Sequence, residues 1–493
     1  MKNTAKKSLS VVLALIMLMS CIGISVSAKT NGYAPLRITC TMYGDSQTQR
    51  GFCWFTEEDC DTVVEIVKAT SGKNFDEAMV FEGESKEFQG YYSHKVVATG
   101  LEAGTTYYYR VGSEENSIWG AEGKFVTDDG NGKFSFLAIA DVQASSYENF
   151  EKAAAVMEAA RATDKNAEFY VNLGDFVNDC TNDEWNWYGE NFLETNTALT
   201  LVPVAGNHEG NPTNKLNPGW FANTFTLDKA EGSLDVNGVY YSFDYGNAHF
   251  CVLNSNDMYP MTEMQRNWII NDLNHSEAHW KFLLLHRAAY SAGKNIDKPD
   301  TLAMRNTIIE IVDATDVDMV FSGHDHMYMR TKQVRADAVV EDVEYVTEVF
   351  NGVETTFAKN PDGAVYVLPS TAGTKRYSVN EYPLDPINEC AEVSLSTKDL
   401  GGCFADVSID GNKLVYRAYA VNDETKEVSE IDSYAIIKEN AEDHTDERNL
   451  NTSIIKTLDG SIFNTVVEIC RLLVTYITKL LPQVIIDAVG GLF

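Results

Sequence analysis

Positive charge is scarce in this chain of 493 residues. Lys and Arg total 39 against 72 Asp and Glu, which gives a formal net charge of −33. Such a surface repels DNA, RNA and anionic bilayers, and this argues against a protein that binds the backbone of nucleic acids. It also repels anionic small molecules. An enzyme acting on phosphates would therefore need concentrated local positive charge, which metal ions could supply.

Apolar runs long enough to span a bilayer are also lacking at the start of the chain. The apolar run at 11–26 follows three lysines and ends in small residues at Ala28, the pattern of a secretory signal peptide. We predict a signal peptide over 1–28 and a secreted or cell-surface protein. The alternative is a lipoprotein acylated on Cys21.

Closely spaced cysteine pairs are absent. The chain has nine cysteines, and none of those beyond the predicted signal peptide forms a CxxC pair. A thiolate metal site is therefore not indicated. Because export permits disulfides, Cys390 and Cys403 could pair across a loop, but the sequence does not decide this.

Short alternating segments dominate residues 33–128, where β-branched and aromatic residues are frequent. Examples are LRITCTMYG, RGFCWFT, TVVEIVKA and TTYYYRVGS. Because no long helical period appears, the pattern predicts an all-β sandwich of about 100 residues. The Gly/Asp-rich stretch 126–133 is typical of a linker and marks a domain boundary.

Residues 133–440 show strands that alternate with helices. Helices are expected at 148–161, 263–273 and 303–314, between apolar strands such as FSFLAIAD, AEFYVNLGD and WKFLLLH. This alternation predicts an α/β domain with buried, largely parallel strands. Residues 441–493 are expected to form a polar linker and an amphipathic C-terminal helix. The helix would pack on the protein or on a second copy, or associate with a membrane surface or the cell envelope.

The apolar strands of the α/β domain end in polar residues of a narrow chemical range. These residues are Asp141, Asp175, Asn207 with His208, His286, and His324 with His326. Ligand sites of open α/β sheets lie at the carboxyl ends of the strands, so these side chains should converge. Carboxylate, amide and imidazole ligands without thiolate suit Zn, Mn or Fe, and their number suits two ions.

The order D…GD…GNHE…H…GHxH resembles the calcineurin-like metallophosphoesterase superfamily, specifically its purple acid phosphatase-like branch. The segments ATGLEAGTTYYYRVGS, VYYSFDYGNAHFCVLNS, GHDHMYMRT and VYVLPSTAG are also similar to that branch. The first of them resembles the fibronectin type III-like N-terminal domain of those phosphatases. Over residues 33–440 the resemblance implies a four-layer α/β/β/α metallophosphoesterase domain preceded by an all-β fibronectin III-like sandwich.

The resemblance also implies a role for each residue at the strand ends. The implied metal ligands are Asp141 and His326 for a first ion, Asp175 for both ions, and Asn207, His286 and His324 for a second ion. A hydroxide bridging the two ions would attack phosphorus in line. His208 would be the general acid for the leaving group, or an imidazole that only positions a ligand. The phosphate itself would contact Asn207 and, as candidates, Arg287, Arg330 or Lys294.

Two positions depart from the family pattern. Purple enzymes carry a tyrosine that binds ferric iron where this chain has Asn178, so a ferric-tyrosinate centre is not expected. Relatives outside the purple branch have a histidine ligand where this chain has Gln143. Either Gln143 or Asn178 could supply a neutral oxygen ligand, or water could fill the gap.

Together these observations predict a secreted phosphoesterase that depends on two divalent ions (Zn, Mn or Fe) and hydrolyses phosphate monoesters of small molecules. Two alternatives stay open. One is a phosphodiesterase or nucleotide hydrolase with the same site, and the other is a cell-surface binding protein with a degraded metal site.

Residues outside these motifs are assigned structural or surface roles. His249 lies in an apolar strand and is expected in the core, whereas His94 lies in polar surroundings and is expected at the surface. The aromatic cluster around Trp185 follows the GD motif, and either loop packing or a lid over the site would explain it.

Overall fold

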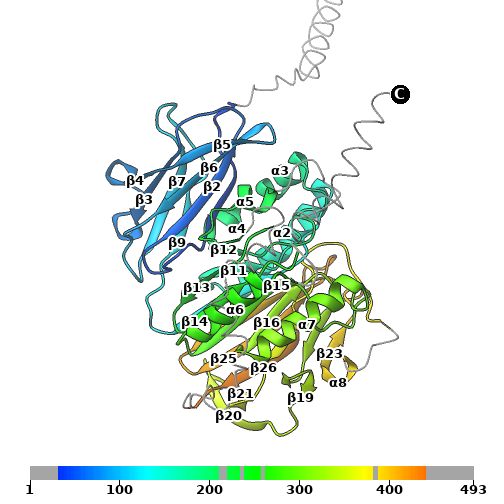
Figure 1. Ribbon diagram of the computed structural model, residues 1–493. Helices are drawn as coiled ribbons and strands as arrows, with labels where there is room; N and C mark the ends of the chain where they lie inside the picture. The colour runs from blue at the N-terminus through cyan, green and yellow to red at the C-terminus, as the bar shows by residue number, and fades with distance from the viewer. Residues whose placement is uncertain (1–30, 210–218, 234–237, 257–260, 381–386, 440–493) are drawn as a thin grey trace, which may run out of the picture.

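The computed structural model describes residues 31–209, 219–233, 238–256, 261–380 and 387–439. The predicted signal peptide and C-terminal helix lie outside these residues. The described chain has an N-terminal all-β region followed by a mixed α/β region (Figure 1). This architecture confirms the predicted fold class. Among the described residues, no helix is both long and apolar enough to cross a membrane.

The N-terminal region consists of two antiparallel sheets with a shared core. The first sheet has the order β1 (Leu36–Thr41), β2 (Arg50–Thr56), β6 (Tyr91–Ala98), β5 (Glu84–Phe88). The second has β4 (Met79–Glu82), β3 (Val63–Lys68), β7 (Thr106–Ser113) and β8 (Ile118–Trp119), with β9 (Gly123–Val126) also on β7. Short 3-10 turns lie at Ala69–Ser71 and Phe75–Glu77. Large side chains such as Phe52, Trp54 and Tyr107 fill the space between the sheets because alternate residues of each strand point inward. The fibronectin III-like assignment remains a prediction.

The α/β region contains two larger sheets. One has the order β20 (Glu344–Phe350), β21 (Val353–Lys359), β26 (Val428–Ile437), β25 (Lys413–Val421), β24 (Gly402–Asp410), β10 (Lys133–Ile139), β11 (Phe169–Asn172), β12 (Thr200–Pro203). It continues into the N-terminal region, because β1 pairs with β12 in parallel through Thr41 and Leu201. The other has the order β13 (Tyr241–Tyr245), β14 (Ala248–Val252), β15 (Trp280–Arg287), β16 (Met319–Gly323), β22 (Val365–Leu368), β17 (Tyr328–Thr331), β23 (Ala391–Leu395). A small hairpin joins β18 (Val334–Arg335) to β19 (Ala338–Val339).

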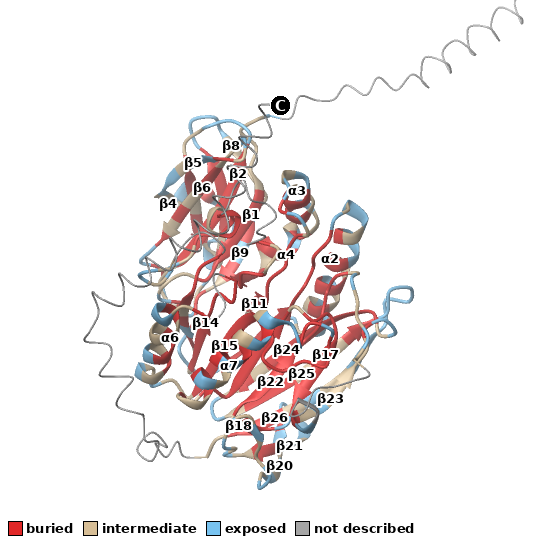
Figure 2. Ribbon diagram, turned by 45° about the vertical axis from the view of Figure 1, so that its right-hand side comes forward, coloured by how far each residue is buried: buried red, intermediate tan, exposed pale blue. Residues whose placement is uncertain are grey.

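The two sheets of the α/β region pack face to face through aromatic rings. The ring of Phe136 on β10 lies 5.4 Å from that of Phe250 on β14 and 5.8 Å from that of Phe282 on β15. Helix α2 (Tyr147–Thr163) packs on the outer face of the first sheet, against β24 and β10. Helices α6 (Glu263–His275) and α7 (Pro299–Asp313) cover the outer face of the second sheet, and their buried apolar residues form one hydrophobic cluster with those of the strands. The layers therefore follow the expected α/β/β/α order, and Figure 2 shows the strands between them as buried.

The three helices expected from the sequence are present as α2, α6 and α7, within a few residues of their predicted bounds. The remaining helices are α3 (Asn182–Asn191), α4 (Leu193–Ala198), α5 (Trp220–Thr224) and α8 (Ile387–Cys390). Trp185 of α3 is fully buried and stacks on Trp220, 6.2 Å away between ring centres, so loop and helix packing explains its aromatic cluster. Cys390 and Cys403 are not paired, and all seven cysteines of the described residues are free.

His249 on β14 is buried, as expected, and it connects two acidic side chains. Its Nδ1 lies 2.7 Å from Oδ1 of Asp244, and its Nε2 lies 2.9 Å from Oδ2 of Asp272 on α6. Burial disfavours the charged ring, but the two carboxylates outweigh this and raise the pKa of His249 to about 9. The protonated ring thus ties helix α6 to the edge of the second sheet.

The His249 ion pairs should make stability depend on pH in the alkaline range. A folded-state pKa above the unfolded value of about 6.5 means that the stabilisation is complete below that pH and is lost as pH rises through about 9. We expect His249→Gln to lower the free energy of unfolding by about 2 kcal/mol near the unfolded pKa of about 6.5, and by clearly less near the folded pKa of about 9. The expected loss is kept to this size because Asp244 is largely exposed and solvent screens its ion pair. Urea unfolding of both proteins across the window measures this, with the exposed His275→Gln as control. If the free energies of unfolding of the wild type and His249→Gln changed in parallel with pH, the His249 ion pairs would not be the cause of the pH dependence.

Candidate metal centre

The residues predicted at the strand ends come together at the carboxyl ends of β10, β11, β12, β15 and β16. Three of them hold left-handed backbone conformations, with φ of 52° at Asp141, 56° at Asp175 and 74° at His324. Such conformations cost an L residue about 1–2 kcal/mol each and cluster at functional sites. The sharp turns after the apolar strands therefore aim these side chains at one place.

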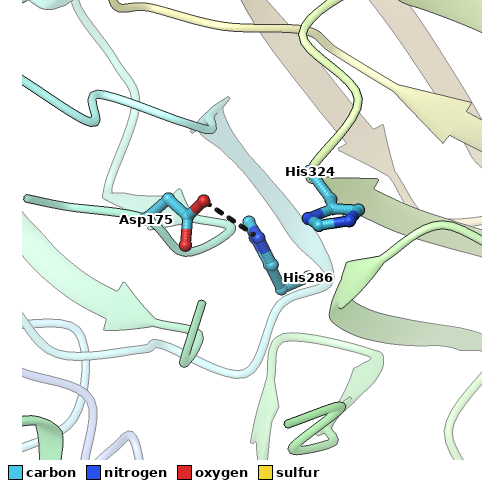
Figure 3. Close-up of side chains that lie close together, drawn as sticks. All are labelled: Asp175, His286 and His324. Carbon is cyan, nitrogen blue, oxygen red and sulfur yellow. Dashed lines mark ion pairs between the residues drawn. The ribbon is translucent and has the colours of Figure 1, made fainter. Parts of the chain in front are cut away.

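Two groups of candidate ligands share one carboxylate. Asp175, His286 and His324 form one group, and Asp141, Asp175 and His326 form the other. Figure 3 shows the first group, with Asp175 Oδ2 and His286 Nε2 3.3 Å apart. In the second group, Asp141 Oδ1 and His326 Nε2 are 3.4 Å apart. Asp175 thus stands between two places where a cation fits.

Hydrogen bonds to backbone carbonyls orient two of the imidazoles. Nδ1 of His286 lies 2.8 Å from the carbonyl oxygen of Leu173, and Nδ1 of His326 contacts the carbonyl oxygen of Lys375. When a neutral imidazole donates its Nδ1 proton in this way, the lone pair at Nε2 is available to a metal. His286 Nε2 is also 3.1 Å from Oδ1 of Asn207, which brings the predicted amide ligand into the first group.

The pKa values of the candidate ligands are shifted in opposite directions. Burial raises the pKa of Asp141 well above its usual value. The pKa of Asp175 is lowered because, although burial opposes it, His286, His208 and their hydrogen bonds stabilise the carboxylate. The same pairing, against the effect of burial, raises the pKa of His286 to about 9, whereas burial lowers the pKa of His326 to about 3. The Asp175 carboxylate and the His286 imidazole thus stabilise each other's charged forms, whereas burial favours the neutral forms of Asp141 and His326.

Glu209 is a residue of the site that the sequence analysis did not single out. Its buried carboxylate accepts backbone N–H bonds at both oxygens: Oε2 from Gly206 at 2.8 Å and Asp175 at 2.9 Å, and Oε1 from Phe176 at 2.8 Å. Burial and the nearby charge of Asp175 raise the pKa of Glu209 to about 7. Glu209 therefore ties the loop after β12 to the loop after β11 and fixes where Asp175 points. The sequence could have indicated this residue, because Glu209 is the last residue of the GNHE motif.

Replacing Glu209 by Gln should destabilise the protein almost as much as removing the side chain. Both oxygens face N–H donors, so the amide NH₂ group meets a donor in either orientation. We expect a loss of about 2–3 kcal/mol in unfolding free energy, because a buried donor is left without an acceptor. Urea unfolding measures it. Glu184→Gln is the matched control, since buried Glu184 accepts from Asp179 and Thr181 at Oε2 alone and an amide oxygen can replace it. Equal stability of the two variants would contradict this role.

His208 lies beside Asp175 and the two positions that depart from the family pattern. Its Nε2 is 3.9 Å from Oδ2 of Asp175 and contacts the amide of Gln143, while its Nδ1 contacts the carbonyl oxygen of Asn178. Asn178 turns its own side chain to Asp179, 2.8 Å away. The imidazole is thus held on both ring nitrogens and is partly open to solvent, with 19% of its side chain exposed.

The two arginines proposed for phosphate contact have different surroundings. Arg287 Nη1 lies 3.2 Å from Nε2 of His324 and 2.9 Å from Oδ2 of Asp300, so its guanidinium is at the ligand cluster. Arg330 forms a bidentate ion pair with Asp432, in which Nε donates to Oδ2 at 2.6 Å and Nη2 donates to Oδ1 at 3.0 Å. Its donors therefore face a carboxylate of β26. Nζ of Lys294, the third candidate, lies 3.8 Å from the ring centre of Tyr377. The Tyr377 ring stacks on that of His326, with the two ring centres 4.5 Å apart.

Comparison with known proteins agrees with this geometry. Residues 134–328 match the calcineurin-like phosphoesterase family, and residues 35–127 match the purple acid phosphatase N-terminal domain. The chain therefore carries a calcineurin-like phosphoesterase domain and a purple acid phosphatase N-terminal domain. The predicted resemblance is confirmed.

Individual relatives match over parts of their length. Purple acid phosphatase 13 of Arabidopsis thaliana is 33% identical over 30% of this chain and 28% of its own, and purple acid phosphatase 21 of the same plant is 24% identical over 57% and 63%. The chain thus spans less than two thirds of these relatives. The structure of a purple acid phosphatase from yellow lupin seeds covers 83% of this chain and 75% of that one at 15% identity, with a TM-score of 0.63, which shows the shared fold.

The family implies a dinuclear metal centre, and the chemistry of the donors fits one. Carboxylate, imidazole and amide groups converge without a thiolate, and two ligand groups share Asp175. Among the described residues, Oε1 of Gln143 is also buried and lacks a hydrogen-bond partner. The place of Gln143 beside the cluster, in contact with His208, makes this oxygen a candidate for a neutral ligand.

Proposed function

We propose that this chain is a dinuclear metal-dependent phosphoesterase that hydrolyses phosphate monoesters of small molecules. The sharing of Asp175 by two ligand groups carries the proposal, because one bridging carboxylate is how two cations are held close together. The family and the fold support the same reaction class. The acidic surface repels anionic substrates, and two divalent ions would reverse the local potential at the site of this strongly acidic protein.

The proposed ligands are the six residues of the converging strand ends. Asp141 and His326 would hold the first ion, Asp175 both ions, and Asn207, His286 and His324 the second. Bound divalent ions supply Lewis acidity to phosphate oxygens and lower the pKa of bound water. Because Asn178 stands where purple enzymes carry the tyrosine, we propose Zn, Mn or Fe(II) without a ferric-tyrosinate centre. The Asn178 side chain itself points to Asp179. Gln143 Oε1 is the better candidate of the two for a neutral ligand.

The chain's own residues would bind and protonate the substrate. Arg287 is next to His324 and would hold a phosphate oxygen through its N–H groups, which requires Nη1 to give up its ion pair with Asp300 at 2.9 Å. His208 would give a proton from Nε2 to the leaving alkoxide, while the carbonyl of Asn178 keeps Nδ1 protonated and fixes the ring. We retain Arg330 only as a candidate, because a phosphate would have to displace Asp432 from it.

Export and anchoring are further proposals. A signal peptide at 1–28 would direct the protein out of the cytoplasm, and the C-terminal helix would either pack on protein or lie on a membrane surface or the cell envelope. Both segments lie outside the described residues.

Metal analysis together with two substrates tests the proposed function. We expect two ions per chain, and hydrolysis of p-nitrophenyl phosphate that exceeds that of bis(p-nitrophenyl) phosphate and is lost on chelation. Faster turnover of the diester would overturn the monoester assignment and favour the phosphodiesterase. Less than one ion and no turnover with added Zn, Mn or Fe would overturn the enzyme and favour a binding protein.

A further inference from the structure

Strand β20 forms an open edge of the largest sheet. Within the described residues it pairs only with β21, and the β20–β21 hairpin lies at the end of the molecule remote from β3 and β4 (Figure 1). Tyr345 and Val349 of β20 are 56% and 61% exposed, among the most exposed large apolar side chains described. A flat edge strand with exposed apolar side chains is a template for pairing with another strand.

The hairpin register shows which backbone groups face outward. Phe350 and Val353 close the hairpin around Asn351 and Gly352, whose φ values of 48° and 83° are those of a two-residue type I′ turn. In such a hairpin the closing pair exchanges both of its hydrogen bonds, and every second residue along the strand does the same. Tyr345, Thr347 and Val349 are the residues between, so their N–H and C=O groups point away from β21.

The sequence of β20 is complementary to itself in an antiparallel register. If two copies pair symmetrically about Thr347, Tyr345 of one copy lies opposite Val349 of the other, and this occurs twice. These are the residues whose N–H and C=O groups face outward, so backbone bonding and apolar contact use the same register. Aromatic side chains opposite β-branched ones are a favourable cross-strand pair.

Charge does not oppose this register locally. Glu344 would lie opposite Phe350 and Glu348 opposite Val346, so no two acidic residues face each other directly. Glu348 is paired within its own copy with Lys413 at 2.6 Å, and Glu344 lies 3.7 Å from Lys359, which also pairs with Glu439 at 2.8 Å. The strand EYVTEVF contains none of the lysines or prolines that natural proteins place on edges to prevent association.

We propose that β20 is a docking surface for a second copy of this chain, giving a two-fold symmetric dimer with one continuous sheet. The dimer goes beyond the proposed catalytic function and does not depend on it. A single strand pair buries less than the roughly 1,200 Å² of stable interfaces, so the dimer is weak. Because each copy carries a net charge of −33, added salt strengthens it by screening the repulsion, the opposite of a dimer held by ion pairs.

Sedimentation velocity of the full chain at low and high salt tests the proposal. We expect the wild type to shift from 54.8 kDa toward twice that mass as concentration rises, and at lower concentration in about 0.5 M than in about 0.05 M NaCl. Val349→Lys should raise the dimer dissociation constant at least tenfold. Thr347→Pro should do the same, because it removes only an outward-facing N–H.

Val353→Lys is the matched control, since it adds the same charge to the same hairpin at a residue that is 56% exposed but lies on β21. All variants should unfold in urea at the wild-type midpoint, which separates loss of the dimer from loss of the fold whether or not the chain hydrolyses phosphate esters. A wild type that stays monomeric at high concentration and high salt would overturn the proposal. So would a Val353→Lys variant that dissociates as readily as Val349→Lys.

Discussion

Asp175→Asn is expected to reduce phosphate ester hydrolysis by about 10³-fold or more and to lower the metal content below two ions per chain. The loss follows because Asp175 belongs to both ligand groups, and stabilisation by two cations contributes several kcal/mol to the transition state. Asparagine keeps an oxygen for the backbone N–H of His208, which donates to Asp175 Oδ1 at 2.9 Å. Its NH₂ group, however, is a donor and cannot bridge cations. Metal analysis and initial rates measure both effects.

The matched control for Asp175 is Asp318→Asn. Asp318 is also a buried carboxylate; it precedes β16 at the opposite end of the same strands, where it pairs with Lys438 at 2.6 Å. We expect the control to lose some stability but to keep two ions and wild-type turnover. Full metal content and activity in Asp175→Asn would remove the basis of the dinuclear assignment.

The placement of the candidate ligand cluster could be predicted because each candidate ligand directly follows an apolar run. A run such as FLAIA can be recognised as a buried strand, and the polar residue after it must lie at the carboxyl edge of the sheet. Asp141, Asp175 and His286 were found in this way. The local pattern also predicted α2, α6 and α7, whose apolar residues recur at helical spacing.

Residues whose role depends on contacts distant in the sequence were not predictable in this way. Glu209 acts on the backbone of Asp175 and Phe176, more than thirty residues earlier in the chain. The partner of Arg330 is Asp432, on a strand about a hundred residues later. No local pattern contains either partner.

The expectation that His94 is exposed was wrong for the same reason. Its ring is fully buried and stacks on Trp54 at 5.1 Å, and both nitrogens lie 2.7 Å from threonine hydroxyls, those of Thr56 and Thr62. Burial lowers the pKa of His94 to about 4, so the ring is neutral at physiological pH. The hydroxyls that satisfy this buried imidazole come from residues 32 and 38 positions earlier in the chain, and only the folding of the strands brings them beside it.

His208→Ala is expected to slow the hydrolysis of alkyl phosphate monoesters by about 10²–10³-fold but that of p-nitrophenyl phosphate by less than about tenfold. Nitrophenolate leaves without a proton, whereas an alkoxide needs one in the transition state. The geometry directs Nε2 toward the metal centre, because Nδ1 contacts the carbonyl oxygen of Asn178 and Nε2 lies 3.9 Å from Oδ2 of Asp175. A proton on Nε2 requires the amide nitrogen of Gln143, which contacts Nε2, to turn away from it. Comparison of kcat/KM for the two ester classes measures the difference.

The selectivity for the leaving group separates acid catalysis from simple positioning. If His208 only held Asp175 in place, both ester classes would slow equally and metal content would fall. Acid catalysis instead leaves two ions bound and flattens the dependence of rate on leaving-group pKa in the wild type relative to the variant. His275→Ala, which removes an exposed imidazole bonded to Asn271, serves as control and should change neither rate. An equal loss on both esters would assign His208 to the support of the metal centre.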